Sequence, residues 1–441
     1  MSDLPFYLRG NFAPVEHEVS ATDLEVRGDI PAELNGLYLR NGPNPFGYDP
    51  GHWFGGDGMI HGVQLEEGRA AWYRNRYVQT RRYKGEEVQL VDEEGRVDYT
   101  AGQSNTHVVG HAGRILALVE TSFPMELSRE LETLGPVDFD GRLKHSFTAH
   151  PKICASTGEM LAFGYGFAPP FLVFHRISAA GEMLQSEAIE VPGPTMMHDF
   201  AITDRHVVFM DLPIVFSPGA LERGGFPYEW KPSYGARLGV MPRGGGNADV
   251  KWFEIDPCYV FHPMNAHAEE GSVVLEVARY PSLMRREGDG VEEACLTRWG
   301  IDLQAGTVKE ERLDDRSIEF PRVDPRREGR RNRYGYAVGM ANHTEGFGMK
   351  NLVKYDLEAG SSEVHELGAA RSPGEGLFVP AHSKAAEDEG YLLAYVYDAE
   401  ANGSELLVLD AQNFSAEPLA RVSLPQRVPA GFHGSWIPDA D

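Results

Sequence analysis

Short apolar segments closed by turn residues recur along the whole chain, and this pattern constrains the fold more than any other feature. The segments are at most eight residues long and rich in Val, Ile, Leu, Phe or Tyr. The clearest are Arg114–Glu120, Glu159–Tyr165, His206–Asp211, Ser272–Ala278, Gly390–Tyr397 and Glu405–Asp410. Segments of this length and composition predict β-strands. Turn dipeptides between segments predict paired strands: Glu67-Gly68, Ala180-Gly181, Asp289-Gly290 and Asn402-Gly403.

Helical patterns are few. Met125–Leu134 places Leu127, Leu131 and Leu134 at helical spacing, and we interpret it as a short amphipathic turn within a loop. No long low-complexity linker interrupts the 441 residues. The sequence therefore predicts a single all-β domain over residues 1–441. A β-propeller fits best, because its radial blades leave only short, protected strand edges. No repeat is clear enough to give the number of blades.

The charge balance excludes one class of partner. The chain has 41 basic and 66 acidic residues, a net charge of −25. A surface this acidic repels phosphate backbones and anionic lipid head groups, so we expect no nucleic-acid partner. The dense basic stretch at residues 323–333 is interpreted as a solvated loop. Any membrane contact would need a local apolar patch.

The cysteines and the N-terminus indicate the compartment. Cys154, Cys258 and Cys295 are far apart and form no CxxC motif, which is typical of a reducing environment. The first residues show no apolar run behind a basic start, and no stretch approaches the length of a membrane span. We therefore expect a cytoplasmic protein.

Four of the sixteen histidines stand in apolar or aromatic surroundings. They are His150, His198, His262 and His433. A buried imidazole stays neutral, which is the state that binds a metal ion. Neutral imidazoles suit iron, copper, nickel or zinc, and composition does not choose among them. For each histidine alone, a core position with a hydrogen bond to a backbone carbonyl is the more frequent explanation.

Spacing adds nothing to the metal hypothesis, because the four histidines form no local ligand motif. Residues this far apart in the sequence converge only where distant strands of a closed fold meet. Several other histidines lie among polar residues, and we expect them at the surface: His17, His52, His206, His343 and His365.

Segments in order along the chain carry a resemblance to a known family. They are Asp29–Gly36, Arg40–Pro45, Trp53–His61 and the four histidine segments. Together they resemble the carotenoid cleavage oxygenases, which include lignostilbene dioxygenases, isoeugenol oxygenases and the retinoid isomerase. The resemblance implies a seven-bladed β-propeller with Fe(II) on its axis, and with loops and short helices covering one face. It also implies that the four histidines bind the iron.

The resemblance implies further site residues. Glu120, Glu319 and Glu375 match glutamates that hold the ligands corresponding to His198, His262 and His433, and His150 has no such partner. A carboxylate that accepts the outer N–H fixes the tautomer of a ligating imidazole. Thr106 matches the residue that leans towards an open iron position and leaves one place for O₂. Without the resemblance, we would interpret these residues as solvated carboxylates and a strand threonine.

Two departures from the family pattern concern Gly55 and Val119. Gly55 replaces an aspartate found in many relatives, a change confined to a turn. Val119 stands where relatives that cleave hydroxystilbenes or isoeugenol generally carry a lysine that binds the phenol with a tyrosine. Because valine cannot pair with a phenolate, we expect an apolar polyene as substrate.

The sequence thus predicts an Fe(II)-dependent oxygenase that cleaves a conjugated C=C bond of a carotenoid or apocarotenoid with O₂ into two carbonyl products. Phe167–Phe171 and Phe216–Trp230 are candidates for the lining of the substrate tunnel or its mouth, and packing within loops is the more frequent explanation of such segments. The second segment is equally consistent with an apolar entrance patch at a membrane. Alternatives are a lignostilbene-type dioxygenase, a retinoid-type isomerase that consumes no O₂, and a non-catalytic ligand-binding propeller. The sequence does not determine which bond is cut or the oligomeric state.

Overall fold

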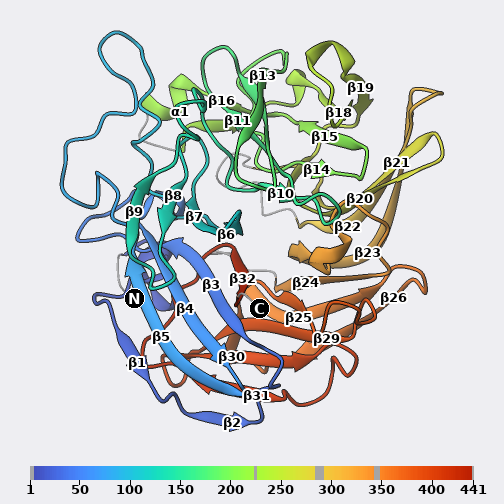
Figure 1. Ribbon diagram of the computed structural model, residues 1–441. Helices are drawn as coiled ribbons and strands as arrows, with labels where there is room; N and C mark the ends of the chain where they lie inside the picture. The colour runs from blue at the N-terminus through green and yellow to red at the C-terminus, as the bar shows by residue number, and fades with distance from the viewer. Residues whose placement is uncertain (1–3, 223–225, 284–292, 342–347, 440–441) are drawn as a thin grey trace. The chain divides into compact units, whose positions relative to one another are not determined.

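The computed structural model describes residues 4–222, 226–283, 293–341 and 348–439 (Figure 1). Strands make up 48% of the structure and helices 5%, so the predicted all-β class is confirmed. The chain divides into two compact units. Unit 1 comprises Met1–Val137 and Arg333–Asp441, and unit 2 comprises Asp138–Asn332.

In unit 1, the first and last parts of the chain share one antiparallel sheet. Its strand order is β1 (Ser20–Thr22), β5 (Arg69–Tyr77), β4 (Gly58–Glu66), β3 (Gly36–Pro43) and β32 (Gly434–Pro438). Strand β32 pairs with β3 through Arg40 and Gly434. Because His433 directly precedes β32, this pairing fixes the backbone position of one candidate ligand within unit 1.

Three further sets of paired strands lie in unit 1. The first runs β6 (His107–His111), β7 (Arg114–Leu118), β8 (Met125–Leu127) and β9 (Thr133–Pro136). The second runs β2 (Val26–Gly28), β31 (Ala420–Ser423), β30 (Gly403–Asp410), β29 (Gly390–Asp398) and β27 (Arg371–Pro373), with β28 (Leu377–Pro380) also paired to β29. The third runs β24 (Tyr334–Ala341), β25 (Gly348–Asp356) and β26 (Ser361–Glu366).

Unit 2 is built from antiparallel meanders. One runs β10 (Lys152–Ile153), β11 (Met160–Tyr165), β12 (Leu172–Ile177) and β13 (Met183–Ala188). Another runs β14 (Ala201–Ile202), β15 (His206–Asp211), β18 (Ala236–Pro242) and β19 (Lys251–Ile255). A third runs β20 (Tyr259–Glu269), β21 (Ser272–Tyr280), β22 (Cys295–Asp302) and β23 (Thr307–Arg322). Four-stranded meanders are the unit that propellers repeat, as the sequence predicts.

The remaining regular elements of unit 2 are short. Strands β16 (Ile214–Phe216) and β17 (Tyr228–Trp230) pair with each other, and α1 spans Pro218–Glu222 between them. Among the described residues, no helix is long and apolar enough to cross a membrane.

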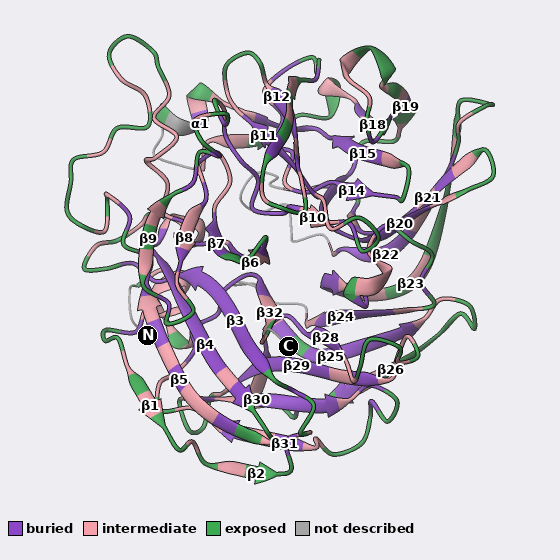
Figure 2. Cartoon of the chain, viewed as in Figure 1, coloured by how far each residue is buried: buried purple, intermediate pink, exposed green. Residues whose placement is uncertain are grey.

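The six predicted strands coincide with β7, β11, β15, β21, β29 and β30. The predicted turns at Glu67-Gly68 and Asn402-Gly403 connect β4 to β5 and β29 to β30, and Glu67, Gly68 and Asn402 have positive φ values. Ala180-Gly181 joins β12 to β13, and Asp289-Gly290 lies outside the described residues. Figure 2 shows that the central strands, such as β3 and β29, are buried along most of their length.

The predicted amphipathic turn at residues 125–134 is wrong. This segment forms β8, a turn and the start of β9. Leu127 pairs with Ile115 of β7, and Leu131 occupies the turn at φ 70° with its side chain buried. Leu134 is 63% exposed. Pairing with β7 satisfies the backbone groups that a helical turn would otherwise bond internally.

Two surface expectations also need correction. His365 is 5% exposed, and its Nδ1 lies 3.0 Å from the Phe414 carbonyl oxygen. The basic stretch 323–333 is not fully solvated, because Asp324 and Asn332 are buried. Asp324 pairs with Arg326 at 2.6 Å, and Asn332 accepts a hydrogen bond from Asn265. Of the other histidines expected at the surface, His17 is exposed, His52 and His206 are half-buried, and His343 lies outside the described residues.

Buried histidines outside the candidate site make folding sensitive to acid. Burial lowers the pKa of His175 to about 4 and that of His61 well below its ordinary 6.5. Between those values the unfolded chain binds protons that the folded chain does not, so stability falls as the pH drops below about 6.5. We expect the urea midpoint to fall between pH 7 and pH 4.5, and to fall less in His175→Asn. An equal fall in both proteins would contradict this explanation.

Candidate metal centre

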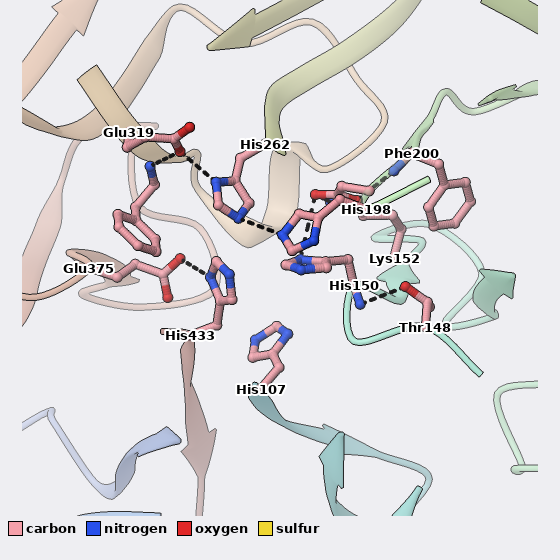
Figure 3. A network of polar contacts seen from close by, with 12 residues as sticks. His107, Thr148, His150, Lys152, His198, Phe200, His262, Glu319, Glu375 and His433 are labelled. Carbon is pink, nitrogen blue, oxygen red and sulfur yellow. Dashed lines mark hydrogen bonds and ion pairs between the residues drawn. The ribbon is translucent and has the colours of Figure 1, made fainter. Parts of the chain in front are cut away.

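Three histidines of unit 2 turn their rings towards one another (Figure 3). The ring centroid of His198 lies 4.4 Å from that of His150 and 5.1 Å from that of His262. The Nε2 atoms of His198 and His262 are 3.3 Å apart, and one ligand nitrogen of each of the three lies within 4.8 Å of the others. Metal–nitrogen bonds of about 2.1 Å put neighbouring ligands roughly 3 Å apart, so this spacing fits nitrogens that share one ion.

Different elements supply these three side chains. His262 lies in the long strand β20, whereas His150 and His198 lie in the segments that precede β10 and β14. The backbone N–H of His150 donates to the Thr148 hydroxyl at 2.8 Å, which fixes the turn before β10. Each ligand is therefore anchored by the start or body of a strand rather than by a free loop.

Aromatic rings enclose this cluster. Phe261 meets the His198 ring edge-on, with centroids 5.0 Å apart, and Phe320 stacks on His262 at 5.2 Å. His150 and His262 are buried. These rings shield the imidazoles from water and leave their ligand nitrogens in apolar surroundings.

A carboxylate fixes the tautomer of His262. Oε2 of the buried Glu319 lies 2.5 Å from His262 Nδ1 and also accepts the backbone N–H of Phe320 at 2.9 Å. With its proton held on Nδ1, the imidazole presents Nε2 as the nitrogen that binds a metal. The structure thus brings Glu319 and His262 together, and the role of Glu319 at a metal centre stays a prediction.

His433 has the same arrangement in unit 1. Its Nδ1 lies 2.9 Å from Oε1 of the buried Glu375, whose Oε2 accepts the backbone N–H of Gly434 at 3.0 Å. Glu375 precedes β28 and His433 precedes β32. The carboxylate thus binds both the ring and the backbone that follows it, which orients the imidazole firmly.

Thr106 lies beside His433 in unit 1. The Thr106 carbonyl oxygen accepts the His433 backbone N–H at 3.1 Å. The Thr106 hydroxyl donates to the Asn105 side chain at 3.0 Å, which leaves its methyl group as the apolar part of the side chain. Its role at an iron position stays a prediction.

Sequence analysis did not single out His107. Its ring centroid lies 5.2 Å from that of His433, and its Nε2 is 3.2 Å from the Gly434 carbonyl oxygen. His107 opens β6 and is buried. The only indication of His107 in the sequence was its position directly after Thr106.

Glu120 and Val119 follow the end of β7 in unit 1, and both are half-buried. His198, the ligand that the resemblance pairs with Glu120, belongs to unit 2. The pairing of Glu120 with His198 therefore stays a prediction.

Sequence analysis also missed two charged residues of unit 2. Asp199 Oδ2 lies 3.6 Å from His150 Nδ1, and the Lys152 ammonium is 3.0 Å from the Asp199 carboxylate. Burial raises the pKa of Asp199, and the Lys152 charge acts in the opposite direction. The only signal in the sequence was proximity: Asp199 follows His198, and Lys152 is two residues after His150.

The two aromatic segments expected at a substrate tunnel meet in unit 2. The Phe216 ring lies 5.4 Å from Phe167 and 5.9 Å from Tyr228, and Tyr228 lies 5.5 Å from Phe226. All four side chains are half-buried. Residues 223–225 of the second segment lie outside the described residues. The two segments therefore form one aromatic cluster, which we call the 167–228 cluster.

Comparisons with known proteins identify the family. A family model described as retinal pigment epithelial membrane protein matches residues 12–438. A carotenoid cleavage oxygenase of Mycobacterium tuberculosis is 43% identical, over 98% of this chain and 97% of its own. The chain belongs to the carotenoid cleavage oxygenase family.

Further relatives of this oxygenase come from plants and from solved structures. A carotenoid 9,10(9',10')-cleavage dioxygenase of Crocus sativus is 37% identical over 98% of this chain and 89% of its own. The crystal structure of a Pseudomonas brassicacearum lignostilbene dioxygenase matches all of both chains, with a TM-score of 0.89 and 31% identity. The oxygenase thus has the propeller-type β fold predicted for it.

Proposed function

We propose that this oxygenase uses Fe(II) and O₂ to cleave a conjugated C=C bond of a carotenoid or apocarotenoid into two carbonyl products. The observation that carries the proposal is that two buried histidines, His262 and His433, each direct Nδ1 towards a buried carboxylate, so that Nε2 remains for a metal ion. Such a set suits an ion that keeps positions open for small molecules. The relatives named as carotenoid-cleaving enzymes support this substrate class.

We propose that the iron is bound by His150, His198, His262 and His433, each offering one nitrogen. Four neutral ligands leave the full charge of the ion uncompensated within the ligand set. When bound, iron(II) supplies the capacity to activate O₂. The donor set fits this metal, because imidazole nitrogen is a good iron ligand and the described cluster offers no thiolate.

The protein's own residues orient the iron ligands and keep water away from the substrate. Glu319 and Glu375 hold the protons of His262 and His433 on Nδ1, and we propose the same role for Glu120 towards His198. We propose that the Thr106 methyl restricts one side of the iron. No acid or base is required of the protein, since its contribution is to place one double bond at a fixed position in a dry site.

We propose that the 167–228 cluster lines the route of an apolar substrate. Half-buried aromatic rings suit a polyene because they offer apolar surface without hydrogen-bonding groups that would have to be desolvated. The same cluster would collect substrate from a membrane surface, and we propose a cytoplasmic protein in which it makes this peripheral contact. Three free, buried cysteines agree with a reducing compartment.

A lignostilbene-type reaction is the second candidate. It is favoured by the close structural match to the Pseudomonas brassicacearum lignostilbene dioxygenase. Val119 weighs against it, because a buried phenolate without a cation is costly. A retinoid-type isomerase would keep the iron but take up no O₂, and a non-catalytic propeller would bind ligand without product.

A direct comparison of substrates separates these candidates. We expect kcat/KM for a long apocarotenal to exceed that for resveratrol by about tenfold or more, because an apolar residue at position 119 gives a phenolate no partner. Aldehyde products identified by mass spectrometry, together with O₂ uptake, are the measurements. A tenfold preference for resveratrol would overturn the substrate assignment.

Two variants at one position control this comparison. Val119→Lys introduces a cation, and Val119→Met has a similar length without charge. We expect both to lower apocarotenal cleavage and neither to create efficient resveratrol cleavage. Strong resveratrol activity in Val119→Lys alone would instead identify position 119 as the sole determinant.

A further inference from the structure

The family resemblance leaves His150 as the one proposed ligand without a carboxylate partner, yet a carboxylate lies beside it. Asp199 Oδ2 is 3.6 Å from His150 Nδ1. Asp199 is 2% exposed and belongs to the same unit as His150. We propose that Asp199, held by Lys152, is the positioning residue for His150. This inference rests on the proposed metal centre.

Contacts other than His150 fix the Asp199 carboxylate. Its Oδ1 accepts the backbone N–H of Phe200 at 2.6 Å, and the Lys152 ammonium lies 3.0 Å away. A buried carboxylate costs much free energy unless it is paired, and the ammonium offsets that cost. The contacts with Phe200 and Lys152 thus hold the Asp199 carboxylate in place independently of the His150 ring.

The arrangement repeats the design of the two glutamate partners. Glu319 accepts a ring N–H from His262 and a backbone N–H from Phe320. Glu375 likewise accepts from His433 and Gly434. Asp199 combines a ring contact with a backbone N–H in the same way.

One difference from the two glutamates predicts how firmly Asp199 orients the His150 ring. Its oxygen lies 3.6 Å from the ring nitrogen, against 2.5 Å for Glu319 and 2.9 Å for Glu375. The Lys152 ammonium also forms an ion pair with the same carboxylate. A longer contact to a shared carboxylate supports the ligand less, so His150 is the least firmly oriented of the three.

The chain contains a matched pair that contacts no candidate ligand. In unit 1, the Lys354 ammonium donates to the Asp388 carboxylate at 2.8 Å and to the Ala411 carbonyl oxygen at 2.7 Å. Lys354 is buried. Neutralising Asp388 therefore removes the carboxylate of a buried lysine, as neutralising Asp199 does, but without touching a histidine of the metal centre.

The test compares Asp199→Asn with Asp388→Asn in the full-length protein. Fe(II) affinity is measured by competition with a chelator, and the visible spectrum of the Co(II)-loaded protein reports ligand geometry. We expect Asp199→Asn to weaken Fe(II) binding about tenfold, the lower end of the effect of such partners, and to change the Co(II) spectrum. Asp388→Asn should alter neither by more than about twofold. Equal behaviour of the two variants would overturn the inference.

A measurement on the wild-type protein tests the inference even if the Asp199→Asn variant does not fold. In the Co(II)-loaded protein, the Nδ1 proton of each bound histidine gives a shifted, solvent-exchangeable NMR signal. A slowly exchanging signal assigned to His150 supports a carboxylate partner for this ring, whereas a rapidly exchanging signal assigned to His150 contradicts it. If the wild type binds no metal, or His150→Ala binds it normally, the proposed function itself fails. Normal metal binding with an unaffected Asp199→Asn defeats only this inference.

Discussion

Purified His262→Ala is expected to retain less than about a tenth of the iron found in the wild type, and to lose cleavage activity with it. The wild type should carry close to one iron per chain. His262 is expected to matter this much because its Nε2 lies 3.3 Å from that of His198 while Glu319 holds its Nδ1. Elemental analysis of the purified protein, together with aldehyde formation, measures both effects.

A second buried histidine of unit 2 controls for damage to the fold. Both ring nitrogens of His175 are 3.0 Å from partners, Ser186 Oγ and the Ser146 carbonyl oxygen. His175→Asn removes a buried imidazole that has no place in the metal centre, so we expect near-normal iron content. Equal iron loss in both variants, or zinc that supports full turnover, would defeat the assignment of an iron centre.

Glu319→Gln and Glu375→Gln should each weaken iron binding or slow turnover by roughly ten- to a hundredfold. The amide can no longer take a full charge-assisted hydrogen bond from the Nδ1 proton, so the ring is oriented less firmly and binds metal less strongly. Iron affinity and kcat at saturating iron separate the two contributions. Both variants should remain folded, because the backbone bonds to Phe320 and Gly434 can still form.

Glu276→Gln is the matched control for these variants. Glu276 is as buried as Glu319 and lies in the same unit, but its partner is Arg298 at 3.0 Å. We expect its iron affinity to equal that of the wild type. If the two glutamine variants at the metal centre also behave as wild type, these carboxylates do not support the ligands.

Much of the fold follows from local sequence. Alternating apolar runs closed by Gly, Asn or Asp turns predicted strands such as β15 and β30, because strand periodicity is a property of neighbouring residues. The same reasoning failed for residues 125–134, where three leucines at helical spacing form a strand hairpin against β7. Pairing with a strand from elsewhere overrode the local pattern.

The candidate site could be predicted only in part. Apolar surroundings marked His150, His198, His262 and His433 as candidates, but the same reasoning placed His365 at the surface although it is buried. Local context thus indicates burial without giving the bonding partner. The glutamate partners came from the family resemblance, since nothing in their local sequence distinguishes them from solvated carboxylates.

The sequence alone determined the strand-rich class and the acidic charge, and it marked the four histidines as candidate ligands. Only the tertiary structure revealed that Lys152 and Asp199, 47 residues apart, form a pair beside His150. It also revealed that one carboxylate, Glu375, binds both His433 and the following N–H. The physical reason is that side-chain contacts depend on the paths of the segments between strands, and periodicity carries no information about those paths.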